Sequence, residues 1–387
     1  MKLTPTGAWL VLGAPGARAP QETMDGACRR LRDEGVPIDR AEAFVRTLHP
    51  NVPGRSFVWH SDRPVDVIEH TYAFLQSEDF RRSAVSEVCR TAAAVRHRAG
   101  EGGPIADVHL LDEPDFGSIT DYVAAPMRFL SGEVHAITIA TRNQGGFTDD
   151  QIAAFTAIIE PMARLAEIMA LHRTAANLLD TYVGRSAGEK ILAGRIQLGD
   201  TETIQAVIWF SDLRDFTRLA GQSAPGDLIR TLNELFECQV PAIEARGGEV
   251  LKFIGDGLLA IFPIREGGPS AADQCRAALQ ASARALAALD VVNGRRATEE
   301  RPPISFGLAL HVGEVAYGNI GGASRLDFTC IGPAVNLAAR LEGITGAAGR
   351  PVVTSESFAA LVGDAVDAIG EFELKGVDGR QRVFAPR

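Results

Sequence analysis

The sequence predicts an α+β protein in three parts: an α/β domain over residues 1–150, a helical linker over 151–200 and an α+β domain over 201–387. Before position 150, short β-branched and apolar runs alternate with turn residues, which is typical of strands joined by short loops. Apolar residues then recur every seven positions, which is typical of a long helix. After position 200, strand-like runs alternate with helical segments, so we expect a sheet with its helices on one face.

The composition is that of a soluble globular protein, with 46% hydrophobic and 23% charged residues. A net charge of −10 without a basic stripe argues against a nucleic-acid partner. The five cysteines are odd in number and include no Cys-x-x-Cys pair, which indicates reduced thiols. The N-terminal apolar stretch is short and is interrupted by Pro15, so it does not predict a signal peptide. No run reaches the ~20 apolar residues of a membrane span, and we expect a cytoplasmic protein without a membrane partner.

Two apolar runs in the last domain each end in an acidic residue. Asp212 follows the strand-like run 207–211, and Asp256 lies in a Gly-Asp-Gly turn between two such runs, which predicts a β-hairpin. Taken singly, Asp212 could cap a helix and Asp256 could form a turn. If the strands are neighbours, the two carboxylates meet at one edge of the sheet and repel each other unless a cation lies between them. Oxygen ligands of this kind favour Mg²⁺ or Mn²⁺.

Three blocks of sequence carry a family resemblance. They read FSDLRDFT at 210–217, KFIGD at 252–256 and IGPAVNLAARL at 331–341. Together they resemble the signature blocks of the class III nucleotidyl cyclases, in the family's order, within residues 203–387. The resemblance implies a ferredoxin-like catalytic fold that makes 3′,5′-cyclic AMP and pyrophosphate from ATP. It also implies two Mg²⁺ or Mn²⁺ ions per site, and a homodimer whose active sites are shared between the chains.

The resemblance also implies the roles of particular residues. Asp212 and Asp256 would hold the two metal ions, and backbone amides up to Phe216 and Thr217, at a helix N-terminus, suit the phosphates. Lys375 matches a lysine that binds the triphosphate.

Asn336 and Arg340 lie four residues apart on a predicted helix and therefore share a face. The resemblance implies that Asn336 orients the ribose and that Arg340 stabilises the transition state. Alternatively, they are a surface asparagine and an arginine held in a salt bridge. Pro333 stands where the family usually has an aspartate, a change that affects helix capping rather than metal binding.

Lys252 and Thr329 align with the family's purine-selecting pair. A lysine donates a hydrogen bond to adenine N1, and a threonine hydroxyl accepts one from the adenine amine. Guanylyl cyclases of the family carry glutamate and cysteine instead, and Cys330 is one position away from the second of these. Threonine in place of the aspartate of many adenylyl cyclases resembles the bicarbonate-responsive subgroup. ATP is the expected substrate; the alternatives are a guanylate cyclase or a weakly active homologue that signals by binding nucleotide.

The N-terminal part carries a second resemblance. Two apolar runs at 122–130 and 133–141 are separated by Ser-Gly, which predicts a hairpin, and the sequence GGFTDDQ then leads into the long helix. This order resembles the end of a GAF domain, a sensor of small molecules. It implies a small-molecule or ion regulator, whose identity the sequence leaves open. Further patterns predict strands at 57–60 and 108–111 and helices at 25–34, 66–75 and 80–95.

In the linker, two apolar series recur every seven residues and predict a parallel coiled-coil seam. The series are Phe155, Met162, Met169 and Ala176, and Ile158, Leu165, His172 and Leu179. Pro161 should kink this helix or begin a new one. The alternative is a single helix packed on its own domain. Beyond the catalytic hairpin, the sequence predicts a helix over 271–289, a polar loop over 291–303, and strands at 304–313 and 326–331.

Overall fold

The computed structural model describes residues 4–47, 52–99, 118–322 and 324–387. The chain divides into two compact units, Met1–Leu178 and Leu179–Arg387. The strand expected at 108–111 lies outside the described residues. Within them, no helix is long and apolar enough to cross a bilayer.

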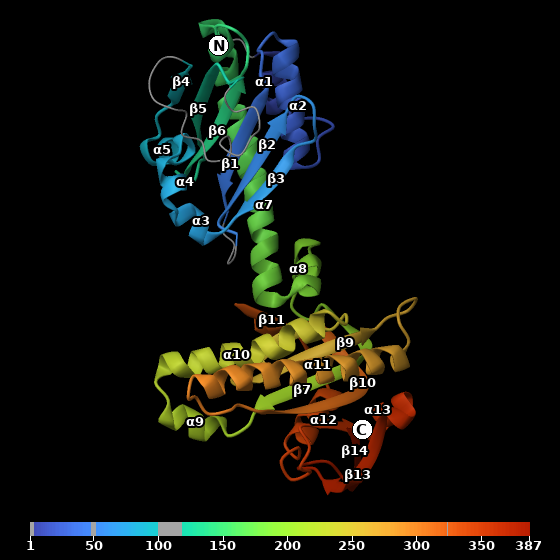
Figure 1. Ribbon diagram of the computed structural model, residues 1–387. Helices are drawn as coiled ribbons and strands as arrows, with labels where there is room; N and C mark the ends of the chain where they lie inside the picture. The colour runs from blue at the N-terminus through green and yellow to red at the C-terminus, as the bar shows by residue number, and fades with distance from the viewer. Residues whose placement is uncertain (1–3, 48–51, 100–117, 323) are drawn as a thin grey trace. The chain divides into compact units, whose positions relative to one another are not determined.

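The N-terminal unit is an antiparallel sheet between two layers of helices (Figure 1). Its strand order is β3-β2-β1-β6-β5-β4, and the strands are β1 (Arg40–Arg46), β2 (Gly54–His60), β3 (Asp66–His70), β4 (Val95–Arg98), β5 (Asp121–Arg128) and β6 (Val134–Thr141). One apolar core joins the sheet to α1 (Pro5–Val11), α2 (Pro20–Asp33) and the long helix α7 (Asp149–Val183). A second core, on the alternate strand residues, joins the sheet to α3 (Tyr72–Gln76), α4 (Glu78–Arg82) and α5 (Ala84–Thr91).

Two of the predicted helices in this unit differ from the structure. The helix expected at 66–75 begins instead as strand β3, because Val67 pairs with Phe57 at the edge of the sheet. The helix expected at 80–95 is divided, because Ser77 and Ser83 accept hydrogen bonds from backbone N–H groups and so begin new helices. The hairpin expected at 122–141 is present as β5 and β6.

Helix α7 continues through Pro161 without a break, so the expected new helix is absent there. Phe155, Ile158 and Met162, expected on a dimer seam, are buried in the core of their own unit. This half of the helix therefore packs on its own domain, which is the alternative to a coiled-coil seam. The apolar residues that α7 leaves exposed lie further on and in another register: Ile168, Leu171, Ala175, Leu178 and Tyr182.

The C-terminal unit is a mixed sheet with the order β13-β14-β12-β10-β7-β9-β8, and β11 pairs with β10 outside this path. The strands are β7 (Thr201–Leu213), β8 (Glu249–Ile254), β9 (Gly257–Ile264), β10 (Phe306–Gly322), β11 (Arg325–Ile331), β12 (Val352–Ser355), β13 (Val366–Glu373) and β14 (Arg380–Pro386). The helices are α8 (Arg185–Leu192), α9 (Phe216–Gln222), α10 (Pro225–Glu244), α11 (Ala271–Thr298), α12 (Pro333–Glu342) and α13 (Glu356–Val362).

Helices cover both faces of this sheet, so the expectation of helices on one face is wrong (Figure 1). Helices α10, α11 and α13 pack against Val207 and Trp209 of the central strand β7. Helices α8 and α12 pack against Ala206 and Ile208 on the other face. The reason is the sequence of β7. Its apolar run is continuous rather than alternating, as in strands that are buried on both faces.

The polar loop expected at 291–303 is mostly helix, because α11 extends to Thr298. Its arginines are used in the interior: Arg296 is 2% exposed and forms an ion pair with the buried Glu234 of α10. Arg301 places a second guanidinium 2.7 Å from the same carboxylate. By composition alone, these residues resemble a polar loop. Their ion-pair partner lies more than sixty residues away in the chain, so the local sequence does not reveal it.

Glu234→Ala should therefore destabilise the C-terminal unit by about 3 kcal/mol, because it leaves the buried Arg296 without its charge partner. Glu356→Ala is the matched control, since its ion pair with Arg382 is exposed and should contribute less than about 1 kcal/mol. Urea unfolding followed by far-UV circular dichroism measures both values. Equal destabilisation by the two substitutions would contradict a structural role for the Glu234 cluster.

Candidate active site

The register of three strands brings Asp212 and Asp256 together. Strand β7 pairs with β9 up to Ser211 and Leu258, so Asp212 extends just past the last pair. Hairpin β8–β9 closes with Ile254 opposite Gly257, which leaves Gly255 and Asp256 as its two-residue turn. A Cβ on Gly257 would come within 3.2 Å of an Asp212 carboxylate oxygen. The sequence-predicted meeting of the two acids at one sheet edge therefore has a structural basis.

The two carboxylates interact strongly. Burial, and then the charge of Asp256 together with a hydrogen bond to it, raise the pKa of Asp212 from its ordinary value of 3.8 to about 7. The sequence analysis missed a third acid, Glu342, at the end of α12. Gly307 lies opposite Asp212, and a Cβ there would come within 2.2 Å of Glu342 Oε1. Burial also raises the pKa of Glu342.

The paired Asp212 and Asp256 offer the oxygen donors that a hard divalent cation prefers, but no group of three or more histidine, cysteine, aspartate or glutamate side chains among the described residues is arranged to hold a metal ion. A bound Mg²⁺ or Mn²⁺ ion would replace mutual repulsion with attraction, and carboxylates are the ligands such ions prefer. Asp212 and Asp256 are the residues placed to hold it. Glu342 adds negative charge next to them and is held beside Thr345, whose hydroxyl lies 3.4 Å from it.

Helix α9 begins immediately after the β7 acid. Asp215 adopts a left-handed conformation with φ 59°, and the turn sends the chain into the helix at Phe216. Phe216 packs against the core of the unit, and Thr217 is exposed. The first N–H groups of a helix have no intrahelical acceptors, so those of Phe216 and Thr217 point out of the α9 N-terminus.

Helix α12 presents the predicted Asn336 and Arg340 on one exposed face. Gly332 precedes the helix and Pro333 is its first residue, as proline's missing N–H allows. Within the described part of the chain, neither side chain forms a hydrogen bond or an ion pair. The alternative of an arginine occupied in a salt bridge is therefore not what this chain adopts.

The purine-selecting candidates lie where β8 approaches β11. Lys252 Nζ is 3.0 Å from Asp327 Oδ2, an acid that the sequence analysis did not single out. Thr329, two residues further on β11, is 2% exposed, and its hydroxyl has no partner among the described residues. Lys375 is exposed in the turn between β13 and β14, and no ion pair within the described chain joins it to the other candidates.

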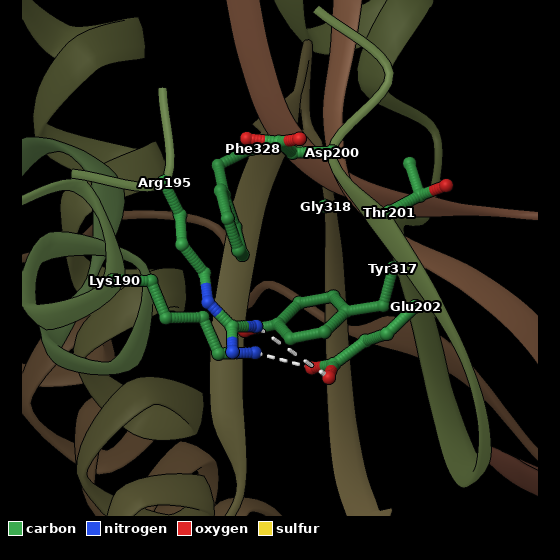
Figure 2. Close-up of a pocket in the computed structure, with 8 residues that line it drawn as sticks. All are labelled: Lys190, Arg195, Asp200, Thr201, Glu202, Tyr317, Gly318 and Phe328. Atoms are coloured by element: carbon green, nitrogen blue, oxygen red, sulfur yellow. Dashed lines mark hydrogen bonds and ion pairs between the residues drawn. The ribbon is translucent and has the colours of Figure 1, made fainter. Parts of the chain in front are cut away.

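A separate hollow of about 200 Å³ lies between α8 and the ends of β7, β10 and β11 (Figure 2). Lys190 of α8 forms an ion pair with Glu202, and its ammonium lies 4.4 Å from the centre of the Tyr317 ring. The ring of Phe328, the residue before Thr329, lines the same hollow. None of the predicted site residues lies in it. The hollow instead lies between α8, the helix before the sheet, and β11, the strand that carries Thr329.

Comparison with known proteins identifies the domain that carries these residues. Residues 200–385 match the model of the adenylate and guanylate cyclase catalytic domain. The chain is 35% identical over 166 residues to an adenylate cyclase of Anabaena cylindrica, covering 42% of this chain and 32% of that protein. It is 30% identical over 185 residues to the terminal-differentiation specific adenylate cyclase of Dictyostelium discoideum, covering 47% of this chain and 8% of the relative.

Among solved structures, the chain is similar to the adenylyl cyclase CyaB from P. aeruginosa, with a TM-score of 0.43 and 25% identity over 48% of this chain and 94% of the other. It is also similar to the guanylyl cyclase Cya2, with a TM-score of 0.42 and 28% identity over 48% of this chain and 92% of the other.

The match over residues 200–385 thus indicates an adenylate or guanylate cyclase catalytic domain. Residues 200–385 belong to the class III nucleotidyl cyclases. The chain spans about a third or less of the two curated relatives named above, so what those whole proteins do is not transferred to it.

The repulsion at the site predicts a pH-dependent stability in the metal-free protein. The pKa of Asp212 is higher in the folded protein than its ordinary value of 3.8, so its contribution to stability is lost as the pH rises from about 4 through about 7. Asp256→Asn should remove part of this loss and raise the Tm at pH 8 by roughly 1–4 °C. Calorimetry in the presence of a chelator measures this shift.

Added Mn²⁺ provides the control, because it should raise the Tm of the wild-type chain more than that of Asp256→Asn. A lower Tm for Asp256→Asn than for wild type at pH 8, without metal, would contradict the repulsion between the two acids.

Proposed function

We propose that this chain is an adenylate cyclase that converts ATP to 3′,5′-cyclic AMP and pyrophosphate. The single observation that carries the proposal is the convergence of Asp212 and Asp256 at the end of β7, with the pKa of Asp212 raised towards neutrality. Two carboxylates kept together against their repulsion indicate a cation site, and a nucleotide triphosphate arrives with divalent cations. The match of residues 200–385 to the cyclase catalytic domain supports the same chemistry.

In the proposed reaction the ribose 3′-hydroxyl attacks the α-phosphorus in line, and the bond to the pyrophosphate oxygen breaks. Bound Mg²⁺ or Mn²⁺, two per site, would supply charge neutralisation and acidify the hydroxyl. The protein supplies position and further positive charge. The amides at the start of α9, at Phe216 and Thr217, bind phosphate oxygens, and Lys375 binds the triphosphate. Asn336 orients the ribose, and Arg340 stabilises the charge on the phosphorus centre.

ATP is the proposed substrate because Lys252 presents a donor for adenine N1 at the edge of β8. With guanine, the N1–H group would face the lysine ammonium, and two donors would oppose each other. The curated relatives described above are adenylate cyclases, which supports the same choice. The alternatives, a guanylate cyclase or a nucleotide-binding signalling homologue, predict cyclic GMP or no cyclic nucleotide from the purified chain.

We also propose that the active chain is a homodimer with shared sites. Large apolar side chains are exposed on the strand of Lys252 and on the neighbouring strand: Phe253 (53% exposed) and Ile254 (45%) on β8, and Leu326 (38%) and Ile331 (50%) on β11. A patch of this kind is typical of a protein interface. Asn336 and Arg340 are exposed and unpartnered within the described chain, as expected of residues that complete a site on a second copy.

The exposed stripe on α7 supports the same dimer. Ile168, Leu171, Ala175, Leu178 and Tyr182 are spaced alternately by three and four residues, which is the spacing of a coiled-coil seam. This seam replaces the register expected from the sequence. The N-terminal unit, whose ligand we propose to be a small molecule or ion, would then act through the helix that enters the seam. Its six-stranded antiparallel sheet between helices is compatible with a GAF-like sensor.

A mixing experiment tests catalysis and the shared site together. Asp212→Ala and Arg340→Ala should each be inactive alone, because every site in either homodimer lacks one component. After random subunit exchange of equal amounts, half of the dimers are mixed and each contains one intact site. About a quarter of the wild-type rate of cyclic AMP formation from MnATP should therefore return.

Asp212→Ala mixed with Asp256→Ala is the control, because both lesions fall in the same half of the site and no intact site forms. Activity in this control, or none in the test mixture despite demonstrated subunit exchange, would rule out the shared-site dimer.

A further inference from the structure

The N-terminal unit contains a hollow of about 360 Å³ that is separate from the candidate active site. It lies past the ends of β1 and β5, between α3, the turn that joins β5 to β6, and the second half of α7. We call it the N-terminal hollow. Its volume is at the small end of the range for ligand sites in proteins, so it suits one small organic molecule.

Part of the wall of the N-terminal hollow is apolar. Phe129, which follows β5, is buried, and Leu75 of α3 packs against the neighbouring core. Ala170 and Leu171 of α7 continue this surface, and Leu171 is 63% exposed. An apolar group placed against Leu171 would remove this side chain from water, which is favourable.

Two exposed charges of opposite sign line the same hollow. Arg46 is the last residue of β1, and its guanidinium forms no ion pair or hydrogen bond with any residue that the structure describes. Glu133, in the β5–β6 turn, is 61% exposed, and its possible cationic partner in the described chain is His135, 4.0 Å away. Burial, and then the charge of Arg46, lower the pKa of His135 to about 4, so this histidine is neutral at pH 7. Both charges therefore remain available to a ligand.

The third charge of the wall, Glu167, is already satisfied within the unit. Its carboxylate lies 2.9 Å from the guanidinium of Arg164. It also accepts hydrogen bonds from the backbone N–H groups of Leu130 and Ser131, at 2.8 and 3.1 Å. Glu167 thus holds the β5–β6 turn against α7, and the charges left for a ligand are Arg46 and Glu133.

His135 provides an independent sign of a missing partner. The side chain is 0% exposed, and its Nδ1 accepts a hydrogen bond from the backbone N–H of Arg46 at 3.2 Å, so the ring proton is on Nε2. Nε2 has no hydrogen-bond acceptor among the described residues, although buried donors nearly always have one. The ring lies 4.0 Å from that of Phe129, so a ligand oxygen bound beside Phe129 and Glu133 would supply the acceptor.

We propose that the N-terminal hollow binds an apolar α-amino acid. The ligand carboxylate pairs with Arg46, its ammonium pairs with Glu133, and its side chain covers Phe129, Ala170 and Leu171. A zwitterion fits because the hollow offers one unpaired charge of each sign, whereas a simple acid or amine would leave one of them without a partner. Leu171 also belongs to the exposed stripe on α7, so the ligand contacts the helix where the proposed seam forms. The inference rests on the proposed function for its regulatory role, whereas binding itself does not require cyclisation.

The test removes one charge at a time from the ligand. Titration calorimetry of the full chain measures the Kd of L-phenylalanine, of phenylpropionate, which lacks the ammonium, and of phenylethylamine, which lacks the carboxylate. The Kd of L-phenylalanine should be about 10 to 100 times lower than that of either analogue, the range for one charge-assisted hydrogen bond.

Two variants remove the matching charges from the protein. In Glu133→Gln the preference for L-phenylalanine over phenylpropionate should fall to within about twofold of unity, while its preference over phenylethylamine remains. In Arg46→Gln the two preferences should change places. Both substitutions are at exposed side chains, so the fold should be retained. Glu87→Gln on α5 and Arg81→Gln on α4 are the controls, because these exposed charges do not line the hollow, and both should keep the wild-type preferences.

The outcomes separate this site from the proposed catalysis. The amino-acid site is overturned by a wild-type chain that does not bind L-phenylalanine or binds either analogue equally well. It is also overturned if either preference is unchanged in its matched variant. The same preparations are assayed for cyclic AMP from MnATP. A chain that binds in the expected pattern but forms no cyclic nucleotide contradicts the proposed function and supports the amino-acid site, and cyclisation without binding does the reverse.

Discussion

The repulsion between Asp212 and Asp256 is the interaction on which the catalytic unit depends. The strand pairing of β7, β8 and β9 brings the two carboxylates to one edge, where burial and the charge of Asp256 raise the pKa of Asp212 to about 7. Packing in the rest of the sheet, whose central strand is buried on both faces, offsets the unfavourable free energy of this repulsion. Two acids held in this way destabilise the folded chain without metal and would stabilise it when a cation is bound. The same pair of acids therefore bears on both the stability and the proposed chemistry of the domain.

The second constraint is the exposure of part of the candidate site. The acids are half-buried at the strand ends, whereas Asn336 and Arg340 stand exposed on α12 without partners in the described chain. Apolar side chains of β8 and β11 are likewise exposed, on the strands that carry the residues proposed to bind the base. These features are unfavourable for a monomer and would become favourable in the proposed two-fold dimer. Helix α7 carries an exposed apolar stripe in a heptad spacing, through which the N-terminal unit would act on the proposed dimer.

Local signals in the sequence predicted the core of the site. A Gly-Asp-Gly turn between two apolar runs specifies a tight hairpin, and a proline after a glycine specifies the start of α12. These depend on neighbours in the chain. Several failures involve distant partners: 291–298 is helical because Arg296 pairs with Glu234, and 66–70 is a strand because β2 provides an edge. The divided helix at 80–95 is different, because Ser77 and Ser83 are local caps. The heptad series 155–162 was assigned to a second chain, although the unit's own sheet buries it. Glu342 and Asp327 went unnoticed for the same reason, since only the folded chain places them beside Gly307 and Lys252.

The central claim is that the paired acids serve nucleotide cyclisation rather than hydrolysis or binding alone. The most direct measurement is the product balance of the purified full chain with MnATP, by chromatography of the nucleotides and an enzymatic assay of pyrophosphate. Cyclisation predicts cyclic AMP and pyrophosphate in equal amounts, with neither formed when Asp256 is replaced by alanine. AMP with pyrophosphate, ADP with phosphate, or unchanged ATP would contradict the account.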